Sequence, residues 1–253
     1  MKVIRDTQLL FGRSLKVSLR NPVWVILGLF QPILYLLLFA PLLDGLKGAP
    51  GFTGDNALNI FTPGLLIMMA LFNSSFVGFG VIEDLRSGVV ERLRVTPASR
   101  LSLLMGMVLR DIVVVMVQSA LLVVAATVMG LRADPVGLVL LFGLMALIGL
   151  TLAPVSYAIG LAVKDEGSLA ASINTIVVPL MLLSGIMLPL TLAPDLIREI
   201  ARFNPFAHAV DAARALVNGS LGNGDVLTGF AFVAVLAILA VILAVRAFRQ
   251  AIA

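Results

Sequence analysis

The residues that could carry out covalent or metal chemistry are few in this sequence. It has no cysteine and a single histidine, His208. Without thiols the chain has no thiolate metal site, no disulfide scaffold and no cysteine nucleophile. One imidazole cannot supply a histidine-built metal site, which uses two or three. We therefore expect no catalytic centre, no bound metal and no cofactor in this chain, and we interpret His208 as a structural residue.

The charged side chains are gathered in short clusters. Charged residues make up 13% of the chain and hydrophobic residues 60%, whereas about 25% of the residues in an average soluble domain are charged. Too few charges exist to cover the surface of a soluble domain, so the composition indicates an integral membrane protein. The charge-free runs of 20 residues or more are 21–43, 56–82, 112–131, 135–163, 167–194 and 226–245.

Each of these runs is long enough to cross a membrane as a helix, which takes about 20 residues. In lipid the backbone must satisfy its own hydrogen bonds, so we expect helices rather than strands. The sequence predicts an all-α membrane protein with one transmembrane domain over 1–253. The six spans are expected at about 23–43, 60–82, 112–131, 139–162, 168–192 and 226–245.

The distribution of basic residues predicts the orientation of these spans. An even number of crossings places both termini on one side of the membrane. On that side we count 13 Lys and Arg residues, against 5 on the other. Lys and Arg accumulate in cytoplasmic segments, so we expect both termini in the cytoplasm. The loops 44–55, 132–134 and 194–225 are then external.

The N-terminal segment 1–22 has the pattern of an amphipathic helix. At 100° per residue its charged residues fall within an arc of about 100°, and most apolar residues lie opposite, with Leu9 among the charges. Such a helix lies in the membrane interface. Asn21-Pro22 ends it, because the residue before a proline disfavours the helical conformation. Whether it does more than anchor the chain is left open by the sequence.

The segment 83–111 follows the second predicted span and should be cytoplasmic. Leu85, Val89 and Leu93 recur at four-residue spacing, which predicts a short helix that ends near Pro97. Charges of both signs on a small amphipathic body suit docking into a groove of a partner protein. The alternative is a solvated connector whose arginines only set the topology.

The predicted external segment 194–225 has two short apolar stripes. They lie on either side of Asn204-Pro205, which interrupts the helical pattern. Each stripe covers about ten residues, too few to span the hydrocarbon core. We expect a helical hairpin that dips into the outer leaflet before the last span.

No Asp, Glu, Lys, Arg or His falls inside the predicted spans. Ion- and proton-coupled carriers usually rely on such groups, so their absence argues against this class. Spans two and five instead combine uncharged polar side chains with adaptable apolar ones. This mixture suits a path for amphipathic molecules; ordinary interhelical packing is the alternative. The candidate path residues are Phe72, Asn73, Phe76, Asn174, Met181 and Ser184.

Three segments resemble one family of membrane proteins. Val89–Arg100 resembles the cytoplasmic coupling segment of type-2 ABC exporter permeases, Ser184–Leu190 their fifth-span exit, and Arg202–Arg214 their external segment before span six. The order and spacing of these segments agree with the six-span plan over the whole chain. Among these permeases the sequence is most similar to the daunorubicin-resistance type of drug exporter.

The resemblance implies partners and roles for particular residues. It implies that the chain pairs with a second permease copy, identical or closely homologous, and with two ATPase subunits that hold the ATP and Mg. It carries the ATPase-coupling contact onto Glu91, Arg92, Leu93, Arg94, Thr96 and Pro97. It carries an external gate hairpin, with a structural role, onto Asn204, Pro205, His208 and Arg214.

The function that the resemblance implies is transport and not catalysis. The chain would be a multi-pass permease of the bacterial inner membrane that moves amphipathic drug-like or lipid-like substrates out of the cell, as in multidrug efflux and antibiotic resistance. Lipo-oligosaccharide or glycolipid export is the alternative within the family. A channel or carrier that works without ATP and a membrane scaffold are the alternatives from other classes.

Overall fold

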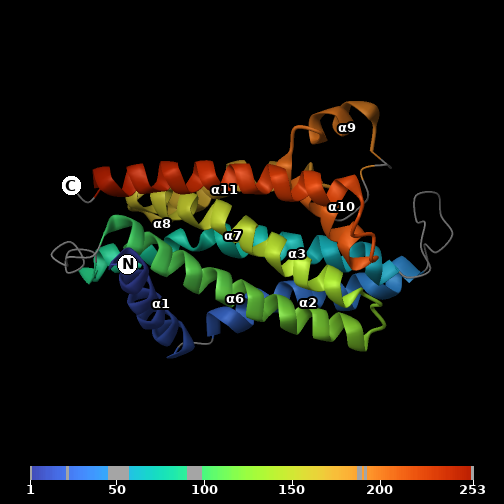
Figure 1. Cartoon of the computed structure of the whole chain (residues 1–253), viewed down its shortest axis with the longest axis horizontal. Coiled ribbons are helices and arrows are strands. Elements are labelled where there is room, and N and C mark those ends of the chain that lie inside the picture. The colour runs from blue at the N-terminus through green and yellow to red at the C-terminus, as the bar shows by residue number, and fades with distance from the viewer. Residues whose placement is uncertain are drawn as a thin grey trace.

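The computed structural model describes residues 2–20, 23–44, 57–89, 99–186, 190 and 193–251, and no strand occurs within these ranges. Most helices run along the long axis of an elongated bundle (Figure 1). The helices are α1 (Lys2–Arg20), α2 (Val23–Asp44), α3 (Ala57–Phe76), α4 (Gly78–Arg86), α6 (Arg100–Val128), α7 (Pro135–Val163), α8 (Glu166–Leu182), α9 (Asp195–Ala201), α10 (Pro205–Val217) and α11 (Gly224–Ala251).

Four segments of the described chain are long and apolar enough to cross a membrane. They are Leu58–Arg86, Leu101–Val128, Pro135–Val163 and Gly224–Phe248. Helix α2 has 22 residues, a length of about 33 Å that also suffices to span. Helix α8 has 17 residues, and its length of about 25 Å is less than the ~30 Å of hydrocarbon. The chain is therefore an all-helical membrane protein, and the count of six spans stays a prediction.

Two helix ends differ from the boundaries expected for the spans and the loop. The fifth span was expected to reach residue 192, but α8 ends at Leu182 and the chain turns through Gly185, whose φ of 70° is left-handed. The loop 83–111 is also shorter than expected, because α4 continues to Arg86 and α6 begins at Arg100. Ser99 caps α6 by accepting a hydrogen bond from the Ser102 amide at 3.1 Å, so helix formation begins well before the charge-free run.

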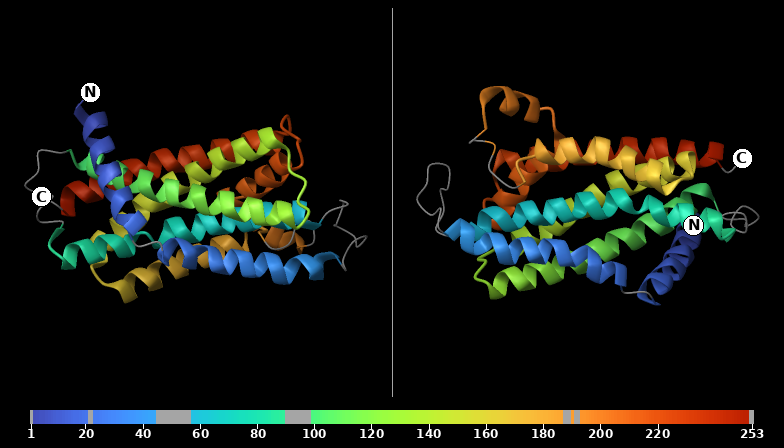
Figure 2. Two further views of the ribbon diagram at one scale, coloured as in Figure 1. Left: turned by 90° about the horizontal axis from the view of Figure 1, so that it is seen from below. Right: turned by 180° about the vertical axis from the view of Figure 1, so that it is seen from behind.

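The two termini lie at one end of the bundle, and α9 and α10 lie at the other (Figure 1). Helix α1 runs across the direction of the long helices at the terminal end (Figure 2). It packs on α6, where a Cβ at Gly106 would lie 2.8 Å from the Leu10 Cβ. Part of the apolar face predicted for α1 therefore contacts protein.

Helix α3 is the most enclosed of the four candidate spans. Of the most apolar stretch of its span 67% is buried, compared with 28% for α11. It contacts α2, α6, α7, α8 and α10. At Gly64 the approach is especially close, because a Cβ there would lie 2.2 Å from the Ile186 carbonyl oxygen. The core is thus built around α3.

The helix that crosses the bundle as α3 and α4 is interrupted at Val77, between the two elements. Ser156 of α7 fills the interruption: its hydroxyl accepts a hydrogen bond from the Gly78 amide at 2.9 Å and donates one to the Ser75 carbonyl. A side chain inserted into the helical ladder is a recognised cause of a kink. Because Ser156 satisfies both groups, the break is a fixed feature of the fold.

Candidate functional site

The six residues expected to contact the ATPase, Glu91, Arg92, Leu93, Arg94, Thr96 and Pro97, lie outside the described residues. The structure does describe the helices on either side of them. Helix α4 ends and α6 begins at the end of the bundle that carries both termini (Figure 1). A movement of the segment between them would therefore be passed directly to α4 and α6.

Two polar contacts tie these helices to the rest of the terminal end. Arg86 of α4 and Glu166 of α8 form an ion pair at 2.5 Å, with side chains 58% and 51% exposed. Such an exposed pair adds little stability, but it does link the two elements.

The N-terminus of α8 is capped by Asp165, and the pKa of that carboxyl is lowered by the hydrogen bonds it accepts from Ser168.

A second, buried group joins α6 to α7. The guanidinium of Arg110 donates to Asp111 and also to the Tyr157 hydroxyl, at 2.9 Å, while that hydroxyl donates to Asp111. Asp111 is 6% exposed and Tyr157 is 1% exposed. Tyr157 was not among the candidate residues identified from the sequence. The only available signal was a phenol within a strongly apolar run.

The aromatic candidates of span two form a ladder with a third ring. The rings of Phe72 and Phe76 are parallel within 5°, with centroids 6.0 Å apart. Those of Phe76 and Phe79 are parallel within 4°, with centroids 5.7 Å apart. Phe76 and Phe79 pack against a cluster that includes Ile173 and Val177 of α8. This aromatic ladder, Phe72, Phe76 and Phe79, is half-buried between spans two and five; Phe79 was missed although it continues the helical spacing.

The two candidate asparagines have different surroundings. Asn73 donates to the Gln118 side chain of α6 at 2.7 Å, and a Cβ at Gly28 of α2 would lie within 3.3 Å of the Asn73 amide oxygen. Asn73 is thus part of the packing among α2, α3 and α6. Asn174 is exposed on α8. The structure does not join the two amides in one contact.

The remaining path candidates lie near the end of α8. Met181 is half-buried and packs against the main core. Ser184 is fully buried, and its hydroxyl donates to the Met181 carbonyl at 2.6 Å. The hydrogen bond of Ser184 thereby stabilises the backbone turn where α8 ends. The Met181 side chain remains partly exposed.

Both ends of α10 hold the end of α8. At its N-terminus the Asn204 amide donates to the Leu180 carbonyl at 2.6 Å, while its oxygen caps α10. Near its C-terminus Arg214 donates to the carbonyls of Gly185 at 2.7 Å and Ile60 at 3.3 Å. Burial lowers the pKa of Arg214, and the neighbouring Asp211 opposes that shift. The hairpin is therefore fixed to the exit of span five.

The other hairpin candidates have structural contacts. Pro205 occupies the first turn of α10, where a missing amide hydrogen costs no intrahelical bond. The ring of His208 stacks on Phe232 of α11, with centroids 4.7 Å apart. Its Nε2 lies 3.0 Å from the Arg202 carbonyl oxygen. Within the described ranges no cluster of His, Cys, Asp or Glu could hold a metal ion.

The sequence of this chain is similar to those of known transport permeases. The ABC-2 type transporter family matches residues 5–218. The chain is 26% identical over 216 residues, 85% of this chain and 75% of the relative, to the daunorubicin resistance ABC transporter permease protein DrrB1 of Streptomyces coeruleorubidus. It is 27% identical over 203 residues, 79% of this chain and 70% of the relative, to the ycf38 protein of Cyanophora paradoxa, which is described as a transport permease. The helical membrane fold and this match together place the chain in the ABC-2 type transporter family, as a membrane-spanning permease of an ABC transporter.

Proposed function

We propose that this chain is the permease of an exporter that moves amphipathic drug-like or lipid-like molecules out of the cell. The energy comes from ATP hydrolysis in a separate ATPase subunit, and the chain itself catalyses no reaction. The observation that carries this proposal is the half-buried aromatic ladder beside α8. One relative is described as a daunorubicin resistance permease, which supports the same class of substrate.

Substrate contact is assigned to the side chains that remain open. Phe72, Phe76 and Met181 are half-buried, and apolar groups of these types adapt to varied shapes. Asn174 is exposed on α8, and an amide left in hydrocarbon would cost several kcal/mol. This cost favours a position for Asn174 at a substrate path or a second copy. The side chains of Asn73 and Ser184 form hydrogen bonds within the chain. We therefore assign them a structural role, in which they fix the segments that border the path.

Coupling to the ATPase runs through α4. The segment with Glu91 and Arg92 follows α4, and α4 follows α3 after the break filled by Ser156. Movement of the ATPases would therefore displace α4, which carries Phe79, relative to Phe72 and Phe76 on α3. The Arg86–Glu166 pair would pass part of this movement to α8.

The external hairpin acts as the gate. Asn204 and Arg214 bind the carbonyls at the end of α8, so a displacement of α8 must move α10 or break these bonds. The functional unit is a permease dimer with two ATPases. Both termini face the cytoplasm of a bacterial cell, because the basic residues accumulate on that side.

Reconstitution of the chain with its ATPase in proteoliposomes tests this function. Inside-out vesicles are given ATP and a panel of fluorescent amphipathic drugs and labelled lipids. We expect uptake of at least one compound that needs ATP, together with stimulation of ATP hydrolysis by that compound. Uptake that is equal without ATP would contradict the proposal in favour of a channel or carrier. If only lipo-oligosaccharide or glycolipid is taken up, the substrate class is lipo-oligosaccharide or glycolipid and not amphipathic drugs.

A further inference from the structure

One ring of the aromatic ladder lies on a different helix from the other two. Phe72 and Phe76 belong to α3, whereas Phe79 belongs to α4, beyond the interruption at Val77. The ring planes of Phe76 and Phe79 nevertheless lie within 4° of parallel, with their centroids 5.7 Å apart. The stacking of these two rings therefore depends on the angle between α3 and α4.

The start of α4 is fixed on α7. The Gly78 amide donates to the Ser156 hydroxyl at 2.9 Å, and a Cβ at Gly78 would lie 2.5 Å from the Ser156 carbonyl oxygen. One turn farther along α7, a Cβ at Gly160 would lie 2.9 Å from the Gly78 carbonyl oxygen. Small residues let two helix backbones approach this closely, and the contact leaves the start of α4 little freedom to shift.

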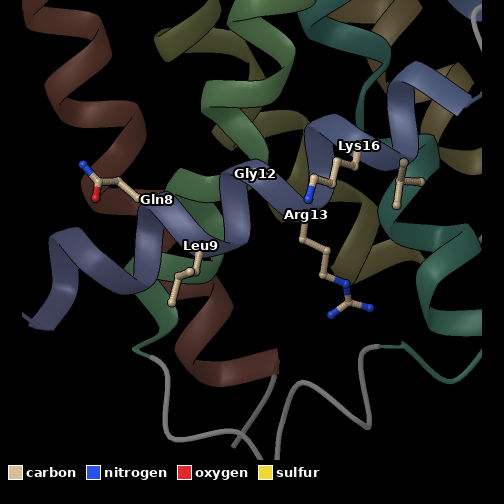
Figure 3. A pocket seen from close by; sticks show the side chains of 6 residues that line it. Gln8, Leu9, Gly12, Arg13 and Lys16 are labelled. Atoms are coloured by element: carbon tan, nitrogen blue, oxygen red, sulfur yellow. The ribbon is translucent and has the colours of Figure 1, made fainter.

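The last turn of α4 is held by charged contacts that solvent weakens. Arg86 pairs with Glu166 of α8, and both side chains are exposed. Arg110 of α6 and Arg13 of α1 both attract the charge of Asp84. Arg13 is itself exposed, and its side chain extends away from α1 (Figure 3). Exposed charge pairs contribute little to stability, so the last turn is held less firmly than the first.

This difference makes the start of α4 a pivot. Between its two ends Val81 and Ile82 are buried among apolar side chains, and such contacts have no preferred direction. The segment expected to meet the ATPase follows the last turn, so a movement there tilts α4 about Gly78. Phe79 is the next residue, and the tilt changes the angle of its ring against Phe76, which stays on α3.

We propose that Phe79 is a specificity-determining residue of the substrate path, and that its stacking on Phe76 sets how the affinity for aromatic substrates changes with the state of the ATPase. With α4 placed as in this structure, the rings form a continuous aromatic surface, which suits a planar aromatic group. A tilt of α4 divides that surface and lowers the affinity. The inference rests on the proposed function, because it needs a substrate on the ladder and an ATPase on the segment after α4.

Binding of rhodamine 123, a planar amphipathic dye, to the permease–ATPase complex in lipid nanodiscs tests the proposal. Fluorescence anisotropy gives the dissociation constant without nucleotide and with ATP and vanadate, which trap the ATPases in a closed state. For the unmodified chain we expect the dissociation constant to rise about ten-fold on closure. Phe79→Leu should weaken binding about five-fold without nucleotide, as expected for one stacked aromatic pair, and leave only about a two-fold difference between the states.

The matched control is Phe72→Leu, which makes the same substitution on α3, where the ring does not move relative to Phe76. It should weaken binding in both states by a similar factor and keep the difference of about ten-fold between them. Phe79→Tyr keeps the ring and should restore the behaviour of the unmodified chain. Helical circular dichroism and size-exclusion profiles check that each variant is folded.

ATP-dependent uptake of the same dye into inside-out vesicles separates failure of this inference from failure of the proposed function. If the dye is taken up but Phe79→Leu keeps the full difference between the two states, the proposal is overturned and the function stands. An equal loss of that difference in Phe72→Leu would also overturn it, because the position of Phe79 on α4 would then have no special effect. If the unmodified chain takes up no dye, the proposed function is contradicted for this class of substrate, and the inference is contradicted with it.

Discussion

The guanidinium of Arg214 donates a hydrogen bond to the carbonyl oxygen of Gly185 at 2.7 Å. Gly185 follows the last turn of α8, and its left-handed backbone directs the chain away from a helical path. The last carbonyls of a helix lack intrahelical partners and need other donors. The carbonyl of Gly185, just beyond α8, also has no helical partner, and Arg214 of α10, whose side chain is 14% exposed, supplies its donor.

Loss of this contact should destabilise the protein. Arg214→Ala leaves the carbonyls of Gly185 and Ile60 without the donor, and we expect the free energy of unfolding to fall by about 2–3 kcal/mol. Arg214→Lys should recover part of it. Denaturant unfolding in detergent micelles measures the change, with Arg202→Ala, an exposed arginine of the same hairpin, as the control. Equal stability of the Arg214→Ala and Arg202→Ala variants would contradict the role.

The break between α3 and α4 gives a second prediction. Ser156→Ala removes the hydroxyl that bonds the Gly78 amide and the Ser75 carbonyl, both buried. We expect a loss of about 1–3 kcal/mol in the free energy of unfolding. Ser172→Ala is the control, since among the described residues its hydroxyl bonds the Ser168 carbonyl of its own helix. A control that loses as much as Ser156→Ala would show that the break needs no external donor.

Energy coupling is tested by exchanging charges in the coupling segment. The double variant Glu91→Arg with Arg92→Glu should fold and reach the membrane, but co-purify poorly with the ATPase or hydrolyse ATP without export. The matched control is Arg198→Glu with Glu199→Arg, which exchanges the same charges on α9 at the opposite end. Normal export and ATPase binding in the first variant would refute the assigned contact.

Topology can be measured with single cysteines, because the chain has none. Gly222 is exposed, and a Cβ there would meet no described atom within 4 Å. A membrane-impermeant maleimide should label Gly222→Cys in intact cells and Ser87→Cys only after the cells are opened. The reverse pattern would place both termini outside and contradict the orientation.

Sequence alone predicted the helical class, the long apolar segments and the break at Asn204-Pro205, because charge spacing and helix capping are local properties. Charge spacing did not predict where α8 ends, because the run from 167 to 194 holds no charge; the resemblance of Ser184–Leu190 to a fifth-span exit did mark the segment that contains the turn at Gly185. Charge spacing also missed Tyr157, whose hydrogen bond is made to Asp111, 46 residues away along the chain. The pairing of Asn73 with Gln118 is of the same kind. Which side chains meet between two helices depends on how the helices are aligned along and around their axes. The hydropathy pattern of the sequence does not give that alignment.

The central claim, that the ladder and the end of α8 form the substrate path, is tested most directly by ATP-dependent uptake into inside-out vesicles. Phe72→Ala and Met181→Ala are compared with Leu243→Ala, an exposed position on α11, for a panel of amphipathic compounds. We expect the first two to change which compounds are taken up while assembly and basal ATP hydrolysis stay near normal. An unchanged compound profile in both, with only the amount of protein reduced, would show that these side chains serve packing and that the path lies elsewhere.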